Sequence, residues 1–457
     1  MIKKQKGTVD IYNDAKIWKY IDFIIDEVMT RYNYKYIRTP IFEDTSLFVR
    51  GVGDSTDIVS KEMYNFKDKG NRDISLRPEG TAGVVRSYIE NKVYADSINP
   101  TKYYYNGTMY RYERPQNGRL REFTQFGCEV LNTNDPLMDA EVISLSYNIL
   151  KSLNIDCKII INSLGNKESR EKYREKLIRH FKKDINSLCD DCKKRYETNP
   201  LRILDCKKDN DKDIFKNIPT MIDNLDNDSK KRFETVLEYL DILKIPYEID
   251  NNLVRGLDYY NDTVFEIVTN DDIGSLGGGG RYSTLVKELD GPDVDGIGFA
   301  VGLDRVVKTI KDNNIKVPKH DFVDIFIMYV NEEENKYALY LTNELRATGF
   351  IVDTEYNNGS LKAQFKKGDR LNSRFNIILN SEDLNNGEIK IKNNKTKEED
   401  VIAIEMLIYY LQEKLFAMNH EDCSCGSECS CHDNHEDCSC GSKCSCHDNH
   451  EDYGCNH

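Results

Sequence analysis

The stretch TKYYYNGTMYRYERPQNGRLREFTQFGCEVL, residues 101–131, decides how the fold is read. Aromatic and apolar side chains alternate with small or polar ones at both of its ends, which is typical of β-strands. The middle is polar and rich in arginine and glutamate. The sequence therefore predicts a hairpin of two strands joined by a charged loop.

Four arginines lie at the mouth of this hairpin. Arg111 ends the first strand, and Arg114, Arg119 and Arg121 lie in the loop. Guanidinium groups match phosphate oxygens and stay charged at any working pH, so the arrangement suits a nucleoside triphosphate. Phe123, beside them, offers a face on which adenine could stack. The alternative is a charged hairpin loop that only contacts solvent, which would be favoured for a random charged loop. Phe123 beside Arg119 and Arg121 favours the nucleotide site instead.

The wording MYRYERPQ–GR–REF–QFGCE resembles motif 2 of the class II aminoacyl-tRNA synthetases, and specifically that of the histidyl-tRNA synthetases. Three more segments resemble this family in the same order: RPEGT at 77–81, LVRGLDYYNDTVFE at 253–266 and GIGFAVGLDR at 296–305. The resemblance covers the chain to about residue 415. It implies a histidine–tRNA ligase, which activates L-histidine with ATP, releases pyrophosphate and transfers histidine to the 3′ end of its tRNA.

The resemblance also implies the architecture. We expect an α+β class II catalytic domain over residues 1–320, with helices flanking an antiparallel sheet and a helical insertion at about 165–240. A C-terminal α/β anticodon-binding domain would cover 321–417. Residues 418–457 lie outside the resemblance, and their composition predicts a disordered Cys/His-rich tail. The amphipathic helix predicted over residues 14–30 and the strand after it correspond to the family's dimer interface, which implies a homodimer. Mg²⁺ would accompany ATP.

The resemblance assigns roles residue by residue. Arg111 would hold the α-phosphate and Arg255 would bridge it to the histidine carboxylate, so these two are the expected catalytic residues. The remaining assignments are Arg119, Arg305 and Phe123 for ATP; Glu79, Gly80, Thr81 and Gln125 around the α-amino group; Glu129 and Tyr260 at the imidazole nitrogens; Tyr259 shaping the pocket; and Gln116 at the acceptor end of tRNA. On the residues alone, the turn around Glu79 is better explained as a helix cap.

Two positions depart from the family pattern. GGRYS has Ser283 where the family has an acid, and GLDR has Asp304 where the family commonly has glutamate. The second change leaves open whether this carboxylate helps to hold a metal ion. The main alternative function is the non-catalytic regulatory subunit of ATP phosphoribosyltransferase in histidine biosynthesis. Such chains typically lose the arginine of LVRGLDYY and the anticodon domain, whereas this chain keeps Arg255 and has a further α/β segment.

The charge of −14 first argues against a nucleic-acid partner. However, residues 420–457 hold nine acidic residues against one lysine, a net of −8, so the rest of the chain carries only −6. Phosphate contacts need local cations rather than a basic total. A helix predicted over 360–373 supplies a basic face, although a solvated helix face is equally consistent; its cations are Lys362, Lys366, Lys367, Arg370 and Arg374.

Other segments carry weaker signals. Asn13 or Asp14 is expected to cap the first helix. The glycine run of LGGGGRYSTLVKELD, residues 276–290, is predicted to open a helix, with its glycines serving close backbone packing. A helix should begin near Leu303 and carry Arg305 in its first turn. No stretch predicts a secretory signal or a membrane span, so we expect a cytoplasmic protein.

Cysteines gather in two places. Cys189 and Cys192 form a C-x-x-C with Cys206 14 residues further on, a spacing that could hold zinc. No fourth ligand is evident, since His180 is a poor candidate, and simple thiols are the default expectation.

The second place is the tail, a repeat of period 15 read as HEDCSCGSECSCHDN and HEDCSCGSKCSCHDN. It has almost no apolar residues and cannot build a core. Its thiols suit Zn²⁺ or another soft metal, with a redox-labile appendage as the alternative. A third alternative function is metal storage or metal sensing by the tail. In that case the rest of the chain would serve only as a scaffold. The candidate ligands are Cys423, Cys425, Cys429, Cys431, Cys438, Cys440, Cys444 and Cys446.

Overall fold

The structure is a computed structural model of the chain. It describes residues 1–53, 56–96, 98–116, 118–206, 208–269, 274–318 and 322–421. These residues form two compact units, one of Met1–Val317 and a second that begins at Pro318. The tail cysteines expected to bind metal lie outside the described residues.

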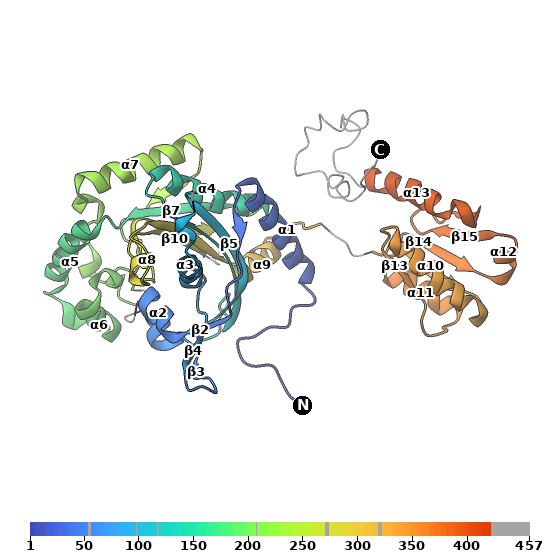
Figure 1. Ribbon diagram of the computed structural model, residues 1–457, viewed down its shortest axis with the longest axis horizontal. Helices are drawn as coiled ribbons and strands as arrows, with labels where there is room; N and C mark the ends of the chain where they lie inside the picture. Colours follow the sequence, from blue (N-terminus) through green and yellow to red (C-terminus); the bar gives the residue numbers. More distant parts are fainter. Residues whose placement is uncertain are drawn as a thin grey trace. The chain divides into compact units, whose positions relative to one another are not determined.

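An eight-stranded sheet is the framework of the first unit (Figure 1). All strand pairs from β5 through β7 are antiparallel, while β1 and β8 add parallel edges. The hairpin predicted over 101–131 is confirmed as β5 and β6, in register from Thr101–Leu131 to Tyr110–Glu122. In spatial order the strands are β1 (Lys35–Tyr36), β5 (Thr101–Tyr110), β6 (Glu122–Leu131), β11 (Gly296–Gly302), β10 (Ser275–Tyr282), β9 (Asn261–Thr269), β7 (Cys157–Ser163) and β8 (Tyr247–Ile249).

The two faces of this sheet differ because side chains alternate along a strand. On β6, Phe126, Cys128 and Val130 are fully buried in the main core. That core also takes apolar residues from four helices: α1 (Ala15–Arg31), α4 (Pro136–Ser152), α7 (Asn227–Ile242) and α9 (Leu303–Asp312). The intervening residues Gln125 and Glu129 point to the opposite face, which therefore stays polar.

The helix predicted near the N-terminus is confirmed, but its predicted cap is not. α1 buries Ile21, Ile24 and Val28 as its periodicity predicts. Asp14 occupies the N-cap position without a side-chain cap hydrogen bond, so the expected cap is wrong. The following segment splits into β1 and β2 (Phe42–Asp44), the latter joining a small sheet with β4 (Asp73–Leu76) and β3 (Asn65–Lys67). Pro40 lies at the break, where it supplies no backbone donor.

The helical insertion is confirmed between β7 and β8. It holds α5 (Lys167–Phe181), α6 (Asp190–Thr198) and α7, which gather at one end of the first unit (Figure 1). Short 3₁₀ turns fill the stretch between α6 and α7. α5, α6 and these turns share a small apolar core of their own.

The glycine run is a strand and not the start of a helix. Residues 277–280 lie within β10, and the helix after them, α8 (Leu285–Glu288), is a single turn. The expectation of close packing is confirmed, because a Cβ on Gly279 would lie 2.0 Å from the carbonyl oxygen of Gly298.

The second unit is the expected α/β domain. Its sheet order is β13-β12-β14-β15-β16, with the first three strands parallel and the last two pairings antiparallel. β16 was not anticipated, since its residues merge with the apolar start of the closing helix. The strands are β12 (Ile325–Tyr329), β13 (Val352–Thr354), β14 (Phe375–Leu379), β15 (Glu388–Asn393) and β16 (Glu399–Ala403); the helices are α10 (Asn335–Ala347), α11 (Leu361–Arg370), α12 (Ser381–Asn385) and α13 (Leu407–Glu421).

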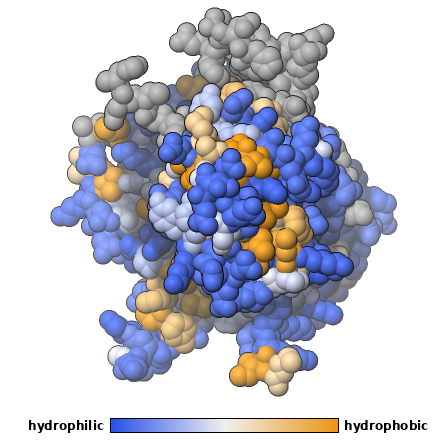
Figure 2. Space-filling model, turned by 90° about the vertical axis from the view of Figure 1, so that its right-hand side faces the viewer, coloured by the Kyte–Doolittle hydropathy of each residue, from blue (hydrophilic) through white to orange (hydrophobic). Residues whose placement is uncertain are grey.

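The visible surface is mainly polar. In Figure 2 hydrophilic residues predominate and the hydrophobic ones form small separate patches. Among the described residues, no helix is both long and apolar enough to cross a membrane.

Candidate active site

A row of residues with little or no side chain crosses the polar face of the large sheet. Gly127 of β6 pairs with Ala300 of β11, and Ala300 pairs with Gly278 of β10. A Cβ on Gly278 would lie 2.4 Å from the carbonyl oxygen of Phe265 and 2.7 Å from Nη1 of Arg255. The row makes room above the central strands for larger side chains from neighbouring elements, such as Tyr105 over Gly127 and Arg255 over Gly278. The region that these side chains share above the row is called the hollow below.

Glu129 is the buried acid of this hollow, with 1% of its surface exposed. Its Oε1 accepts a hydrogen bond of 2.7 Å from the Thr81 hydroxyl, and its Oε2 accepts one of 2.7 Å from the Tyr282 hydroxyl. Gly298 makes room for it, since a Cβ there would lie 2.0 Å from Oε2. Burial raises the pKa of Glu129 to about 8, and the charge of Glu79 adds to the effect.

Glu79 lies at the start of α3 (Thr81–Glu90) and is 4% exposed. Its carboxylate accepts hydrogen bonds from the backbone N–H groups of Thr81 at 2.7 Å and Ala82 at 2.8 Å. The interpretation as a helix cap is therefore confirmed. Burial raises the pKa of Glu79, and the two backbone donors act in the opposite direction.

Four buried polar atoms around the hollow have no hydrogen-bond partner among the described residues. They are Oε1 of Gln125, Nε of Arg255 and the hydroxyls of Tyr105 and Tyr259. A buried polar group without a partner costs about 1–3 kcal/mol, so such groups in native proteins call for an explanation. A small polar ligand that bonds to several of them would remove this cost. The rings of Tyr259 and Tyr260 lie beside each other, with centroids 4.6 Å apart.

Arginines form a positive rim at the edge where β5 ends and β6 begins. Nε of Arg111 donates to the carbonyl oxygen of Pro78 at 2.9 Å, and its guanidinium lies 5.3 Å from the centre of the Phe123 ring. Glu113 pairs with Arg119 at 3.2 Å. Burial lowers the pKa of Arg305 in α9, and the nearby charge of Arg119 lowers it further. Cations that perturb one another in this way favour an anionic ligand.

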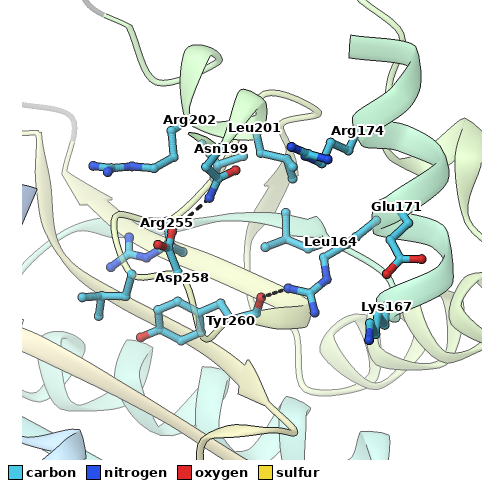
Figure 3. A pocket seen from close by; sticks show the side chains of 13 residues that line it. Leu164, Lys167, Glu171, Arg174, Asn199, Leu201, Arg202, Arg255, Asp258 and Tyr260 are labelled. Carbon is cyan, nitrogen blue, oxygen red and sulfur yellow. Dashed lines mark hydrogen bonds between the residues drawn. The ribbon is translucent and has the colours of Figure 1, made fainter. Parts of the chain in front are cut away.

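Arg255 lies beyond this rim, in the turn before β9. Nη1 forms an ion pair with Glu266 of β9. Arg255 and Tyr260 also line a cavity of about 250 Å³ between the sheet and the insertion (Figure 3). The insertion contributes basic side chains to the cavity wall, namely Lys167, Arg170, Arg174 and Arg202. The insertion therefore adds positive charge to the cavity that Arg255 and Tyr260 line.

The candidate residues from separate parts of the sequence converge on one face of the first unit. The turn of RPEGT, the strand β6 and the segment before β9 supply Glu79, Thr81, Gln125, Glu129, Tyr259 and Tyr260 to the hollow. Gln116 is exposed in the loop, where its backbone exchanges hydrogen bonds with that of Arg119.

Sequence reasoning missed three side chains of the site. Tyr282 binds Glu129, Tyr105 lies against Gly80 and Gly127, and Glu266 pairs with Arg255. Tyr105 had a signal, because it lies on the aromatic face of β5. The other two become visible only through strand pairing: β11 joins β10 to β6 and so brings Tyr282 near Glu129, and β9 pairs Glu266 with Gly278, beside Arg255.

The two departures from the family pattern have local partners. Ser283 exchanges hydrogen bonds with the side chain of Asn261, accepting at 2.9 Å and donating its backbone N–H at 2.7 Å. Oδ2 of Asp304 accepts the backbone N–H of Thr124 at 2.8 Å. Burial raises the pKa of Asp304, and the charge of Glu122 adds to that rise.

Comparisons with known proteins agree with this geometry. Residues 15–306 match the family described as histidyl-tRNA synthetase, and residues 324–414 match the anticodon binding domain. The histidine–tRNA ligase of Staphylococcus haemolyticus is 48% identical over 421 residues, which cover 91% of this chain and all of that protein. The histidine–tRNA ligase of Bacillus cytotoxicus is 46% identical, over 91% of this chain and 99% of that protein.

Solved structures give the same result. The crystal structure of apo S. aureus histidyl-tRNA synthetase aligns with a TM-score of 0.78 and 42% identity, covering 90% of this chain and all of that one. A Bacillus halodurans structure titled ATP phosphoribosyltransferase regulatory subunit/histidyl-tRNA synthetase aligns at 0.59, covering 80% of this chain and 96% of that one; at 22% identity it shares the fold alone. From the matched residues and the identity across nearly the whole length, the chain belongs to the histidyl-tRNA synthetase family.

Proposed function

We propose that this chain is a histidine–tRNA ligase. It activates L-histidine with ATP to histidyl-adenylate and pyrophosphate, and then transfers histidine to the 3′ end of its tRNA. The observation that carries the proposal is the buried Glu129, held between Thr81 and Tyr282 in a hollow whose rim is built from arginines. Such a site suits a small polar amino acid that is presented to a polyanion.

The histidine would occupy the hollow over the glycine row. Glu129 and Tyr260 would bond the two imidazole nitrogens, and Tyr259 would shape the wall. The α-amino group would lie near Glu79, Thr81 and Gln125, and the unpartnered Oε1 of Gln125 supports this assignment. Another amino acid would leave these buried groups unpaired, which accounts physically for specificity.

ATP would bind along the arginine rim. Arg111 would hold the α-phosphate, and Arg119 and Arg305 would clamp the rest of the triphosphate. Phe123 would stack on adenine, because its ring lies beside the Arg111 guanidinium at this edge. Glu113 now pairs with Arg119, so binding would exchange a carboxylate partner for phosphate oxygens.

The activation step needs positioning and charge neutralisation. Arg255 would bridge the histidine carboxylate and the α-phosphate, where it opposes the negative charge that grows as the carboxylate attacks phosphorus. Mg²⁺ supplies further positive charge to the phosphates when it is bound. Glu122 and Asp304 are the carboxylates that would hold it, because Asp304 accepts the backbone N–H of Thr124 and Glu122 lies two residues before Thr124 on β6.

Transfer and assembly complete the proposal. Gln116, exposed in the loop, would meet the acceptor end of tRNA, and the second unit would bind the anticodon. We also propose a cytoplasmic homodimer, supported by apolar side chains at the start of the first unit that remain exposed, including Tyr36 at 53% and Phe42 at 60%. Sedimentation velocity across a range of concentrations tests the dimer.

Pyrophosphate exchange into ATP with each amino acid in turn tests the ligase. Exchange should depend on histidine, collapse in Arg255→Ala and persist in Arg72→Ala, whose side chain is 76% exposed in the turn between β3 and β4. The regulatory-subunit alternative requires no exchange with any amino acid from the folded protein. That outcome would overturn the proposal.

A further inference from the structure

Four potential metal ligands converge in the insertion, away from the hollow. They are Cys189 and Cys192 at the start of α6, Cys206 after the 3₁₀ turn η4 (Pro200–Ile203), and Asp209. Their ligand atoms all lie within 4.8 Å of one another. Asp209 is the fourth group that the cysteine spacing alone did not reveal.

The distances fit a tetrahedral ion. Zinc binds thiolate sulfur at about 2.3 Å and carboxylate oxygen at about 2.0–2.2 Å, which places neighbouring sulfurs roughly 3.8 Å apart and sulfur roughly 3.5 Å from oxygen. Here Sγ of Cys189 and Sγ of Cys206 are 3.8 Å apart, and Sγ of Cys206 is 3.6 Å from Oδ2 of Asp209. A disulfide would need about 2.05 Å and would leave the third thiol unpaired.

The burial of Asp209 supports a cation. Its surface is 2% exposed, and Cys192 and Cys206 are 0% and 5% exposed. Lys212 pairs with Oδ1 at 2.7 Å, and the backbone N–H of Cys189 donates to Oδ2 at 2.8 Å. Oδ2 nevertheless faces thiols, which are weak donors and poor compensation for a buried carboxylate. A divalent ion among these groups would supply the missing positive charge, and Lys212 already offsets part of the excess negative charge of such a site.

The local fold also calls for a crosslink. Between α6 and α7 the chain has only short 3₁₀ turns, η4, η5 (Asp213–Phe215) and η6 (Ile222–Asn224). A segment with so little regular structure and a small core is the setting in which a structural metal is used. Cys189 precedes η4 in the chain and Cys206 follows it, yet their sulfur atoms lie close together. One ion bound to both would therefore tie α6 to the turns that follow.

We propose that Cys189, Cys192, Cys206 and Asp209 form a structural zinc site. Its ligands are distinct from the tail cysteines and from the residues of the ATP-binding rim. It would hold α6 and η4 in place beside the cavity of Figure 3, where Asn199 donates to Asp258 at 3.0 Å. Arg195 and Arg202 from the same stretch pair with Asp57 at 3.4 and 3.1 Å. The metal would therefore fix a wall of the cavity lined by Arg255.

The test must separate this site from the nine tail cysteines. We would use the full-length chain with those nine cysteines replaced by serine, purified with zinc chloride and without chelators, and count metal by mass spectrometry. We expect about one zinc per chain, with less than about a tenth remaining in Cys206→Ser. Cys157→Ser, at a half-buried thiol of β7 outside the cluster, is the matched control and should keep its zinc.

Asp209→Cys guards against a variant that merely fails to fold. It supplies a fourth thiolate and should retain zinc. After cobalt exchange, the parent should show sulfur-to-cobalt charge transfer with tetrahedral d–d bands, and Asp209→Cys should strengthen the charge transfer. A serine-tail chain that purifies without zinc, keeps its zinc in Cys206→Ser, or carries a Cys189–Cys206 disulfide would overturn the proposal.

Discussion

Glu129 is the residue whose chemistry the fold changes most. A glutamate at the end of a charged hairpin would ordinarily be ionised at neutral pH. Here burial raises its pKa to about 8, which favours the protonated acid at neutral pH. An imidazole that donates a hydrogen bond to this carboxyl would favour the ionised form instead. Histidine binding and the titration of Glu129 are therefore coupled.

This coupling predicts how stability depends on pH in the unliganded protein. The pKa of Glu129 is higher in the folded state than in the unfolded chain. Between about pH 4.5 and about pH 8, the folded protein therefore holds this proton more often than the unfolded chain does. Stability should fall across this window, by at most about 1.4 kcal/mol per pH unit from this one group. Glu129→Gln should remove that decline, so its melting temperature relative to the parent should rise from pH 5 to pH 8.

Scanning calorimetry at several pH values measures the difference. Glu234→Gln, at an exposed glutamate of α7, is the control and should follow the parent. Melting curves of Glu129→Gln that stay parallel to those of the parent from pH 5 to pH 8 would contradict the prediction.

Single residues show where sequence reasoning ends. The motifs contain Glu129 and Arg255, but the partners of these residues depend on strand pairing. Tyr282 reaches Glu129 from β10, and Glu266 reaches Arg255 from β9. The helix signal at Asp14 was misleading for the opposite reason, since a suitable side chain at the right position makes no cap hydrogen bond. Chemistry that is local in sequence was predictable, and contacts made by pairing were not.

Among the elements, β10 has the least tolerance for change. Gly278 faces the hollow, and an added Cβ would meet the carbonyl oxygen of Phe265 at 2.4 Å and Arg255 at 2.7 Å. We expect Gly278→Ala to lose about 1–3 kcal/mol of stability through overpacking. It should also lose histidine-dependent exchange, because Arg255 is displaced. Chemical denaturation and the exchange assay measure the two effects.

Gly302 is the matched control for that substitution. It lies at the end of β11, and a Cβ there would meet only the carbonyl oxygen of Leu276 at 3.8 Å, an ordinary contact. Gly302→Ala should therefore be stable and active. If Gly278→Ala is as stable and active as Gly302→Ala, the prediction is wrong, because the side chains around Gly278 can then move to make room for a methyl group.

The basic face of α11 proves narrower than the sequence suggested. Lys362, Lys366 and Arg370 are exposed at helical spacing. Lys367, however, lies 5.2 Å from the Tyr356 ring and 3.6 Å from Glu355, and Arg374 stacks 3.8 Å from the Phe322 ring. Three of the five cations therefore remain as a solvent-facing row.

If this row meets tRNA, reversing its charge should affect charging and not activation. Lys362→Glu with Lys366→Glu should raise the KM for tRNA several-fold, an effect that grows as salt is lowered. Pyrophosphate exchange should be unchanged, because it does not involve tRNA. The same pair of changes at Lys336 and Lys414, exposed on α10 and α13, is the control. Equal losses from both pairs would show that α11 has no special role.

Elements with a clear period were predictable and those decided by pairing were not. The hairpin, α1 and α9 follow from alternation or helical spacing alone. The glycines of β10 carry no side-chain period, so only their registers with β9 and β11 identify a strand. β16 is likewise recognised by its pairing with β15 and not by its own residues.

For the whole molecule, charge and cysteine distribution separate the catalytic body from the tail. The family matches end at residue 414, and the tail carries −8 of the net −14 charge. Neither the hollow nor the arginine rim uses a residue beyond α9 of the first unit. The ligase reaction should therefore be independent of the tail thiols, whatever metal they bind.

The full-length chain with its nine tail cysteines replaced by serine tests this independence. It should charge tRNA and exchange pyrophosphate at rates within about twofold of the parent, since surface changes away from packed features have small effects. The parent should bind additional zinc or another soft metal that the serine-tail chain does not. Replacing the nine residues keeps the length and acidity of the tail, so any change reports on its thiols. A serine-tail chain that folds but loses charging would mean that the thiols, or the metal they bind, take part in catalysis or its control.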